Sequence, residues 1–310
     1  MPVLVKQPVS HVPLPVHPVP LGLTYVDPDG QAWALTDRSS GVVATACAGI
    51  SGPQPALTSV GLPGGGALPQ SYRPVARTIT LGIFVEAVTQ AEFLMRQDRW
   101  TRAIWNERLG YPAPGLLVLA RPDGTSRQIQ VMHVDGGDQA DDSSSKGGLT
   151  WSTYALTFTA ADPLWSDSDS IELSFGSSSA AGVPPMPPIV LAPATLLGDN
   201  QVVNSGDADS YPLWTIRGPG QPTLTNVTTG RTFGLDVTLG SSEIVVVDTR
   251  SGNQSAVDQD GVDRWGDLVK SSPRDLWPLV PGVNSLNLSI AGSDAGSKIT
   301  LSYTRRWLRA

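Results

Sequence analysis

The sequence predicts a mainly β protein with two domains, of which the first carries a single α-helix. Glycine (32 residues) and proline (27 residues) are abundant, and both residue types punctuate strands and interrupt helices. Thr, Val and Ser are frequent wherever short apolar runs alternate with polar residues, as strands require. With 310 residues, the chain is long enough for two cores of ordinary size.

Charge and composition exclude several classes of function. The formal net charge of −7 argues against nucleic-acid binding, because phosphate contacts need a basic face. The single cysteine, Cys47, cannot form an intrachain disulfide, and its surroundings predict a buried or half-buried side chain rather than a catalytic thiol. No run of 18 apolar residues occurs, so we expect no membrane insertion.

The first domain is predicted to span residues 1–173 and to begin with a proline-rich arm over residues 1–20. Prolines at this density favour an extended segment that lies against another surface. Asp27-Pro28-Asp29-Gly30 then predicts a turn between two short strands. Residues 47–71 are rich in Gly and Pro, and we expect a long loop or excursion there. A loop of that length in a compact domain is usually functional or reaches a neighbour.

A strand over residues 77–85 and a helix over about residues 89–109 follow. The strand is RTITLGIFV, with alternating and then continuous apolar residues. Thr89 and Glu92 have the spacing of a capping box. The helix places three large apolar side chains along one stripe, which predicts that they are core residues: Phe93, Trp100 and Ile104.

The remainder of the first domain is predicted to be β structure. Arg121-Pro122-Asp123-Gly124 predicts a hairpin turn, and WSTYALTFTA over residues 151–160 predicts an alternating strand. Between them, residues 135–148 form a polar insert without an apolar anchor, which is typical of a mobile hairpin tip.

The composition shifts to Ser, Ala, Gly and Pro over residues 174–195, which predicts a linker between domains or a strand-swapping crossover. The second domain, residues 196–310, is predicted to be an all-β sandwich, because turn signals separate its strand candidates at short intervals. These candidates are residues 212–218, 222–228, 231–239, 242–250, 275–282, 284–292 and 298–307.

A metal site is the sharpest chemical alternative in the first domain. An imidazole and four carboxylates lie close together in the sequence: His133, Asp135, Asp138, Asp141 and Asp142. Such groups can bind a divalent cation. Their spacing does not match a calcium-binding loop, and the surrounding Gly, Ser and Lys residues favour a solvated turn. We therefore assign no metal site.

Sugar chemistry is the alternative in the second domain. Asp248 with Asp258 or Asp260 could form a carboxylate pair for glycan hydrolysis, and Trp265 or Trp277 could stack on a sugar ring. Aspartates beside Gly and Asn are more often turn residues, and tryptophans in a sandwich are more often core residues. The runner-up function is therefore a carbohydrate-binding sandwich that anchors a particle or enzyme to a cell wall.

Gly218-Pro219-Gly220 raises the possibility of a phosphate-binding loop. Such a loop needs a helix N-terminus directly after it, whereas Thr223-Leu224-Thr225 begins another strand. The glycines are therefore interpreted as a chain reversal, and the sequence gives no catalytic residue and no cofactor site.

Taken in order along both domains, these motifs resemble the distal tail protein family of long-tailed (siphovirus-type) phages, which form the tail-tip or baseplate hub. In the second domain the resemblance rests on residues 210–220, 222–226, 229–230, 243–250, 275–284 and 301–307. In the first domain it rests on the turns at residues 27–30 and 121–124, on the strand over 77–85 before the capped helix, and on Asp162-Pro163-Leu164-Trp165.

The resemblance implies a structural virion protein, not an enzyme, without cofactor or metal. Such a protein forms a hexameric ring that joins the tail tube to the tail tip or baseplate and serves as a platform for host-adhesion components. The implied partners are further copies of this chain, the tail tube protein, the tape measure protein, and the tail-tip hub or receptor-binding proteins. The resemblance also implies a galectin-like second domain. We expect the final strand of this domain to pack on the first domain. We also expect the protein to be synthesised in the cytoplasm of a bacterial host.

Overall fold

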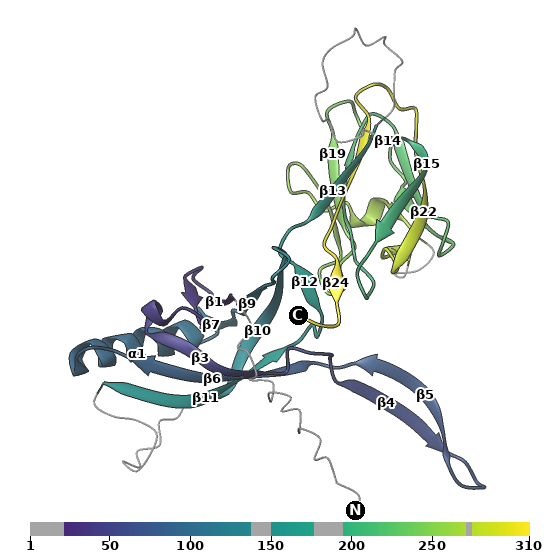
Figure 1. Ribbon diagram of the computed structural model, residues 1–310. Coiled ribbons are helices and arrows are strands. Elements are labelled where there is room, and N and C mark those ends of the chain that lie inside the picture. The colour runs from purple at the N-terminus through teal and green to yellow at the C-terminus, as the bar shows by residue number, and fades with distance from the viewer. Residues whose placement is uncertain (1–21, 138–149, 177–194, 271–274) are drawn as a thin grey trace, which may run out of the picture. The chain divides into compact units, whose positions relative to one another are not determined.

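The computed structural model describes residues 22–137, 150–176, 195–270 and 275–310 (Figure 1). The chain separates into two compact units, residues 1–163 and 164–310. The described residues are mainly β with one α-helix, so the predicted fold class is confirmed. Residues 164–173, which the sequence assigns to the first domain, lie in the second unit. The reason is long-range pairing: β12 (Trp165–Asp167) and β13 (Ile171–Gly176) pair with β24 (Arg306–Trp307) and β23 (Lys298–Tyr303).

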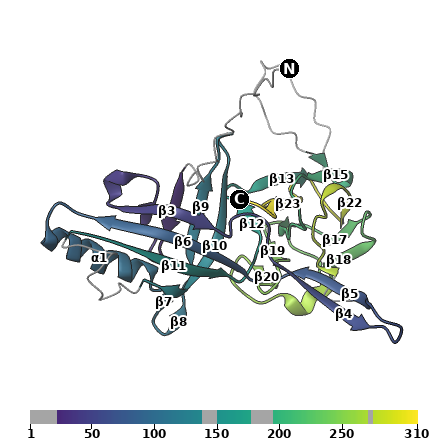
Figure 2. The ribbon, with the colours of Figure 1, turned by 60° about the horizontal axis from the view of Figure 1, so that its bottom comes forward.

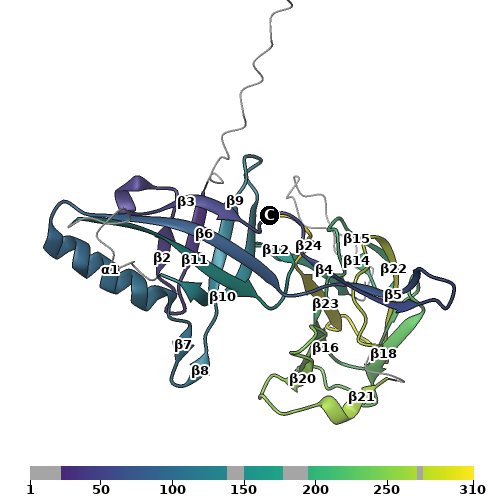
Figure 3. The same cartoon turned by 90° about the horizontal axis from the view of Figure 1, so that it is seen from below.

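The first unit contains one antiparallel sheet with strands in the order β2-β1-β9-β10-β11-β6-β3 (Figures 2 and 3). The predicted turns are present, because β1 and β2 flank residues 27–30 and β9 and β10 flank residues 121–124. The strands of this sheet are β1 (Leu23–Val26), β2 (Ala32–Ala34), β3 (Val42–Ala48), β6 (Arg77–Glu86), β9 (Gly115–Ala120), β10 (Ser126–Gly136) and β11 (Trp151–Ala160). A short 3-10 helix, η1 (Arg38–Ser40), precedes β3.

The core of the first unit lies between this sheet and the helix α1 (Gln90–Ile104). Alternate residues of β6 and β11 point into it, as the period of two along a strand requires. Trp100 of α1 is fully buried and meets the ring of Tyr25 edge-on, with 5.8 Å between ring centroids. Tyr25 in turn contacts Phe158 of β11. The predicted helical stripe is therefore the face that covers the sheet.

The helix begins where the sequence predicts and ends earlier. Thr89 is the N-cap, and its Oγ1 accepts a hydrogen bond from Glu92 N at 3.2 Å. The helix ends at Ile104, not near residue 109. The chain instead forms a small hairpin of β7 (Glu107–Arg108) and β8 (Tyr111–Pro112). Leu109 and Gly110, both with positive φ, make its turn, and a helix cannot continue through that conformation.

Residues 47–71 form an excursion, one of the two predicted alternatives, but with strand pairing that the sequence did not predict. They contain most of a two-stranded antiparallel ribbon of β4 (Pro55–Gly61) and β5 (Ala67–Pro74), which projects from the sheet of the first unit (Figure 1). Its turn is made by residues 62–66, where Leu62 N and Gly65 N bond to carbonyl groups across the turn. The glycines and prolines are concentrated at the turn and at the ends of the ribbon, so they permit strand pairing between them.

The second unit is a β-sandwich. One sheet has the order β14-β13-β23-β16-β19-β20 and the other β15-β22-β17-β18-β21. The strands not yet given are β14 (Thr195–Leu196), β15 (Gly198–Asn204), β16 (Leu213–Arg217), β17 (Gln221–Asn226), β18 (Arg231–Leu235), β19 (Ile244–Asp248), β20 (Ser255–Asp258), β21 (Leu268–Val269) and β22 (Gly282–Ala291). A 3-10 helix, η2 (Trp265–Asp267), precedes β21.

An aromatic cluster fills the sandwich. Trp214, Phe233 and Trp277 are almost completely buried, and Trp214 meets Trp277 edge-on at 5.1 Å between centroids. The prediction of a strand over residues 275–282 is wrong. Before β22 begins at Gly282, this segment makes only one bridge to the described residues, between Ser210 and Leu279, since Pro278 and Pro281 lack the N–H that a ladder needs. Its apolar residues nevertheless lie in the core.

Three predicted features lie wholly or largely outside the described residues: the arm over 1–20, most of the insert over 135–148, and most of the linker over 174–195. Residues 174–176 end β13, and residues 195–196 form β14. The final strand, β24, pairs with β12 (Trp165–Asp167), which the sequence assigns to the first domain. No helix in the described parts of the chain is long and apolar enough to cross a membrane.

Candidate assembly surfaces

The β4–β5 ribbon exposes apolar side chains along its length. Its strands pair only with each other among the described residues. The exposed apolar side chains are Leu57 (59%), Val60 (47%), Leu68 (58%) and Tyr72 (74%), with Leu62 in the turn. Leu57 and Tyr72 are direct partners in the register. An isolated two-stranded ribbon is marginally stable in water, so this ribbon has the properties of an element that is completed by another surface.

The base of the ribbon is anchored in the first unit. The buried side chain of Arg77, at the start of β6, donates hydrogen bonds to Gly49 O at 3.2 Å and to Ser51 O at 2.6 Å. Desolvation lowers the pKa of Arg77 below its ordinary value. These bonds fix the chain where it leaves the sheet, and Val75 N closes the base by donating to Gln54 O.

A second exposed apolar surface lies at the C-terminal end of α1. We call it the aromatic end, and it consists of Trp105, Leu109 and Tyr111, which are 62%, 97% and 74% exposed. Beside it is a hollow of about 330 Å³ lined by Asp29, Thr101, Arg102, Trp105 and Arg108. Sequence reasoning missed this surface because it extended the helix through these residues. The available signal was Leu109-Gly110, which is a turn signal in the last predicted turn of the helix.

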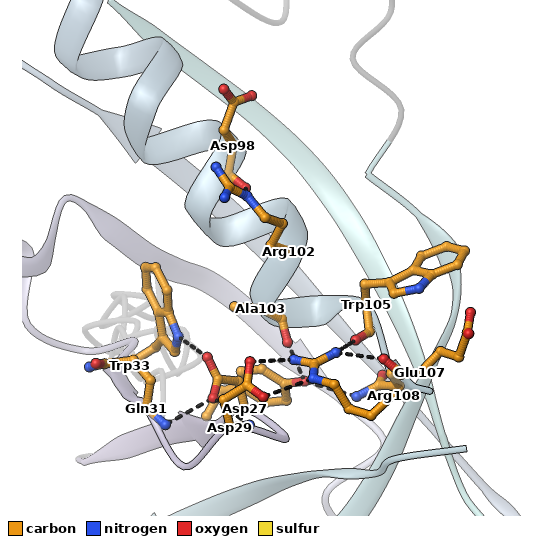
Figure 4. Close-up of polar contacts among 12 residues, drawn as sticks. Asp27, Asp29, Gln31, Trp33, Asp98, Arg102, Ala103, Trp105, Glu107 and Arg108 are labelled. Atoms are coloured by element: carbon orange, nitrogen blue, oxygen red, sulfur yellow. Dashed lines mark hydrogen bonds and ion pairs between the residues drawn. The ribbon is translucent and has the colours of Figure 1, made fainter. Parts of the chain in front are cut away.

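Arg108 fixes the hairpin that carries this surface (Figure 4). Its Nε and Nη2 donate to the two carboxylate oxygens of Asp29 at 2.8 and 2.7 Å, and its Nη1 donates to the carbonyl groups of Trp105 and Glu107. The hydrogen bonds from Arg108 hold the pKa of Asp29 below its ordinary value, and the same pair raises the pKa of Arg108. A two-pronged pair of this kind fixes orientation as well as distance.

The turn that carries Asp29 is itself held by Asp27. One oxygen of the Asp27 carboxylate accepts from Asp29 N and Gln31 N, and the other accepts from Trp33 Nε1 at 3.2 Å (Figure 4). The Asp-Pro-Asp-Gly turn therefore does more than reverse the chain, because it presents a carboxylate to the β7–β8 hairpin.

The residues considered for a metal site are only partly described. His133 lies in β10, half-buried, with its ring against Phe158 at 5.7 Å between centroids. Asp135 is exposed on the same strand, while Asp138, Asp141 and Asp142 lie outside the described residues. No group of His, Cys, Asp and Glu side chains that could hold a metal ion is found within the described ranges.

The acidic residues considered for glycan hydrolysis hold turns. Both carboxylate oxygens of Asp248 accept from the Arg250 guanidinium, at 2.6 to 3.0 Å. Asp258 Oδ1 accepts from the backbone N–H groups of Asp260 and Val262. Asp258 also forms an ion pair with Arg264, which contacts Glu243 and Asp267 as well.

The tryptophans considered for sugar stacking are both covered. Trp277 is completely buried, and its Nε1 donates to Leu224 O. Trp265 packs against the sandwich core, and Lys270 Nζ lies 3.8 Å from the centroid of its ring. A sugar needs an open aromatic face, so neither side chain favours the carbohydrate-binding alternative.

Cys47 is half-buried in β3. Desolvation raises the pKa of its thiol to about 11. Because the thiolate is the reactive form, this environment does not favour a catalytic thiol.

The backbone N–H groups of Gly218 and Gly220 are hydrogen-bonded to carbonyl groups of the protein's own backbone. Gly218 N donates to Glu243 O and Gly220 N donates to Leu239 O, each at 3.0 Å. Gly220 has a φ of 119°, and β17 follows directly. An anion at this turn would need free N–H groups, so the stretch is a reversal between two strands of the sandwich.

Comparisons with known proteins agree with this architecture. Residues 205–307 match the family model described as "Siphovirus-type tail component, C-terminal domain". The crystal structure of the Dit protein of phage SPP1, described as a paradigm of the hub adsorption apparatus in phages that infect Gram-positive bacteria, is 14% identical in sequence. It matches with a TM-score of 0.64 over 92% of this chain and 98% of that chain.

A chain of the phage P2 baseplate in its activated conformation with Ca matches with a TM-score of 0.53 at 9% identity, over 93% of this chain and 99% of that one. No curated protein sequence matches the chain. The shared fold therefore covers both units.

Proposed function

Residues 205–307 match the family of siphovirus-type tail components, and the described residues share the fold of the SPP1 Dit protein. On this basis we propose that the protein forms a hexameric ring at the end of the tail tube. The match of residues 205–307 to this family supports a structural role in the phage tail or baseplate, and thus in the virion. In the proposal, the first unit forms the ring and binds the tail tube and tape measure proteins. The second unit is the platform for tail-tip hub or receptor-binding proteins.

The β4–β5 ribbon is the observation that carries the proposal. Its apolar side chains are exposed on a ribbon that no further strand covers among the described residues. Exposed apolar patches of this kind mark protein contacts. A projecting ribbon on one copy that packs on a different surface of the next copy is a heterologous contact, and such contacts close into rings when the rotation between copies allows it.

The experiment replaces two paired side chains of the ribbon. We expect Leu57→Asp with Tyr72→Asp, placed in the full-length chain, to convert a ring of six copies into a monomer, because two carboxylates would be buried at the contact. Light scattering coupled to size exclusion measures the mass, and electron microscopy of the particles shows whether rings are present.

The matched control is a cross-strand pair in the second unit. Val203 and Val283 are direct partners, 56% and 53% exposed, and changing both to Asp is expected to leave the ring intact. A wild-type chain that stays monomeric at high concentration and is absent from tail tips would contradict the proposal. Loss of the ring in the control alone would assign ring formation to the second unit.

A further inference from the structure

The two ends of α1 carry exposed apolar surfaces of different shape. At the C-terminal end is the aromatic end, a projecting hairpin with Leu109 at its turn. At the N-terminal end is a hollow of about 280 Å³ lined by Phe84, Glu86, Ala87, Thr150 and Trp151. We call this second surface the hollow end, and it consists of these residues together with Val88, which is 90% exposed.

The hollow end has aromatic walls. The rings of Phe84 and Trp151 lie 6.1 Å apart with an interplanar angle of 35°, and Trp151 is 38% exposed. The backbone around the hollow is fixed, since Trp151 pairs with Glu86 in the register of β6 and β11, and Ala87 N donates to Thr150 O. An apolar side chain that enters such a hollow releases water from aromatic surface.

The aromatic end is built to project. Leu109 is almost fully exposed and has a φ of 52°, a conformation that costs free energy for any residue with a side chain other than the short polar ones. Arg108 holds the hairpin through its paired bonds to Asp29 (Figure 4). The chain thus keeps a leucine in a strained conformation at a site where the described residues leave it almost fully exposed, which favours a contact with another molecule.

Charge distinguishes the two ends. The hollow end carries the carboxylate of Glu86, and Glu92 lies in the first turn of α1. The last turn of α1, beside the aromatic end, carries the guanidinium of Arg102. The carboxylate of Glu86 on one copy and the guanidinium of Arg102 on the next carry opposite charges, and opposite charges across a contact fix its register.

We propose that the aromatic end of one copy inserts into the hollow end of the next copy. The inference rests on the proposed ring and names a contact within it, separate from the β4–β5 ribbon. The two surfaces lie at opposite ends of a 15-residue helix, about 22 Å apart at 1.5 Å per residue, and Figures 2 and 3 show the β7–β8 hairpin and the start of α1 at these two ends. A contact that joins the front of one copy to the back of the next is the geometry of a cyclic ring.

Disulfide trapping tests the contact in the full-length chain. In a Cys47→Ser background, the pair Val88→Cys and Leu109→Cys is expected to give a ladder of covalent multimers up to the size of the ring on oxidation. Each single substitution alone is expected to give no ladder. Rings without a ladder in the double variant would overturn this contact and leave the ring proposal standing. Absence of any ring would overturn both.

Two further variants separate assembly from folding. Leu109→Gly removes the side chain and relieves the left-handed conformation, so we expect an unchanged or higher melting temperature together with assembly weakened about tenfold, the loss of one apolar anchor. Glu86→Arg and Arg102→Glu are each expected to weaken assembly, and together to restore it. Equal assembly of Leu109→Gly and wild type, or no recovery in the double reversal, would overturn the proposal.

Discussion

The two units of the protein differ in where they keep their aromatic side chains. In the second unit, Trp165, Trp214 and Trp277 are completely buried, and none of the described aromatic residues of that unit is exposed. In the first unit, four aromatic side chains are exposed: Tyr72, Trp105, Tyr111 and Trp151. The sandwich buries its aromatic residues between its two sheets, whereas the first unit has a core of the same kind and exposes further aromatic residues outside it.

This difference indicates which unit needs partners for assembly. The sandwich closes on its own aromatic cluster, so its core is complete without a contact to another copy. The first unit exposes apolar side chains on the β4–β5 ribbon and at both ends of α1, which is typical of a protein that is completed by contacts with other chains. The comparison can be tested by removing side chains that are alike in chemistry and differ in burial.

The largest effect on stability is expected from Trp277→Ala. Truncating this buried indole leaves a cavity in the aromatic cluster of the sandwich and is expected to lower the free energy of unfolding by about 3–5 kcal/mol. Denaturant unfolding followed by near-ultraviolet circular dichroism measures the loss.

Trp105→Ala is the matched variant in the first unit. Because Trp105 is 62% exposed, its truncation is expected to change stability by no more than about 0.5 kcal/mol while weakening assembly. A large loss of stability in Trp105→Ala, or none in Trp277→Ala, would contradict the comparison between the units.

An intermediate effect for each residue involved is expected at alkaline pH. Burial raises the pKa of Tyr25 and of Tyr154 in the first unit to about 12. The folded state favours the neutral phenols. Their contribution to the free energy of unfolding is therefore complete below pH 10, the ordinary pKa of tyrosine, and is lost as the pH rises to 12. Each tyrosine is expected to reduce the free energy of unfolding by about 1.4 kcal/mol per pH unit in that window.

The alkaline prediction is checked by comparing urea unfolding between pH 9 and pH 12 for the wild type and Tyr154→Phe. The variant should lose less stability across the window, because phenylalanine has no proton to release. Parallel pH profiles for the two proteins would show that Tyr154 is not responsible for the loss.

The smallest effect is expected from Asp29→Asn. The change removes the charge of the pair with Arg108, and exposed pairs contribute little because water and salt screen them. Since the pKa of Asp29 is lowered in the folded state, the contribution is present above the ordinary carboxyl pKa and disappears as the pH falls. A small difference in melting temperature at neutral pH should vanish at low pH or in high salt. A difference that persists in acid would indicate a neutral structural role for the side chain.

Sequence reasoning succeeded where the signal was local. Thr89 and Glu92 marked the start of the helix, the turn at residues 27–30 joined two strands as predicted, and the alternation in β6 gave its buried face. It failed where the partner is distant in the sequence. Residues 171–176, which form β13, were assigned to the end of the first domain and the start of the linker. The sequence did not reveal that β13 pairs with β23, more than 120 residues later. The β4–β5 ribbon was predicted as a loop or excursion without strands, because its Gly and Pro residues obscured two strands that pair only with each other among the described residues.

By itself, the sequence determined the fold class, the capped helix, the turns between neighbouring strands and the resemblance to distal tail proteins. These properties follow from the local conformational preferences of residues and from the order of motifs along the chain. The tertiary structure alone decided how far the tryptophans outside the helical stripe are exposed. Trp277 and Trp105 have the same side chain, but Trp277 is 0% exposed and Trp105 is 62% exposed. The difference depends on which distant strands cover each position. The exposed surfaces at the two ends of α1 follow from this packing of distant strands and could not be read from the sequence.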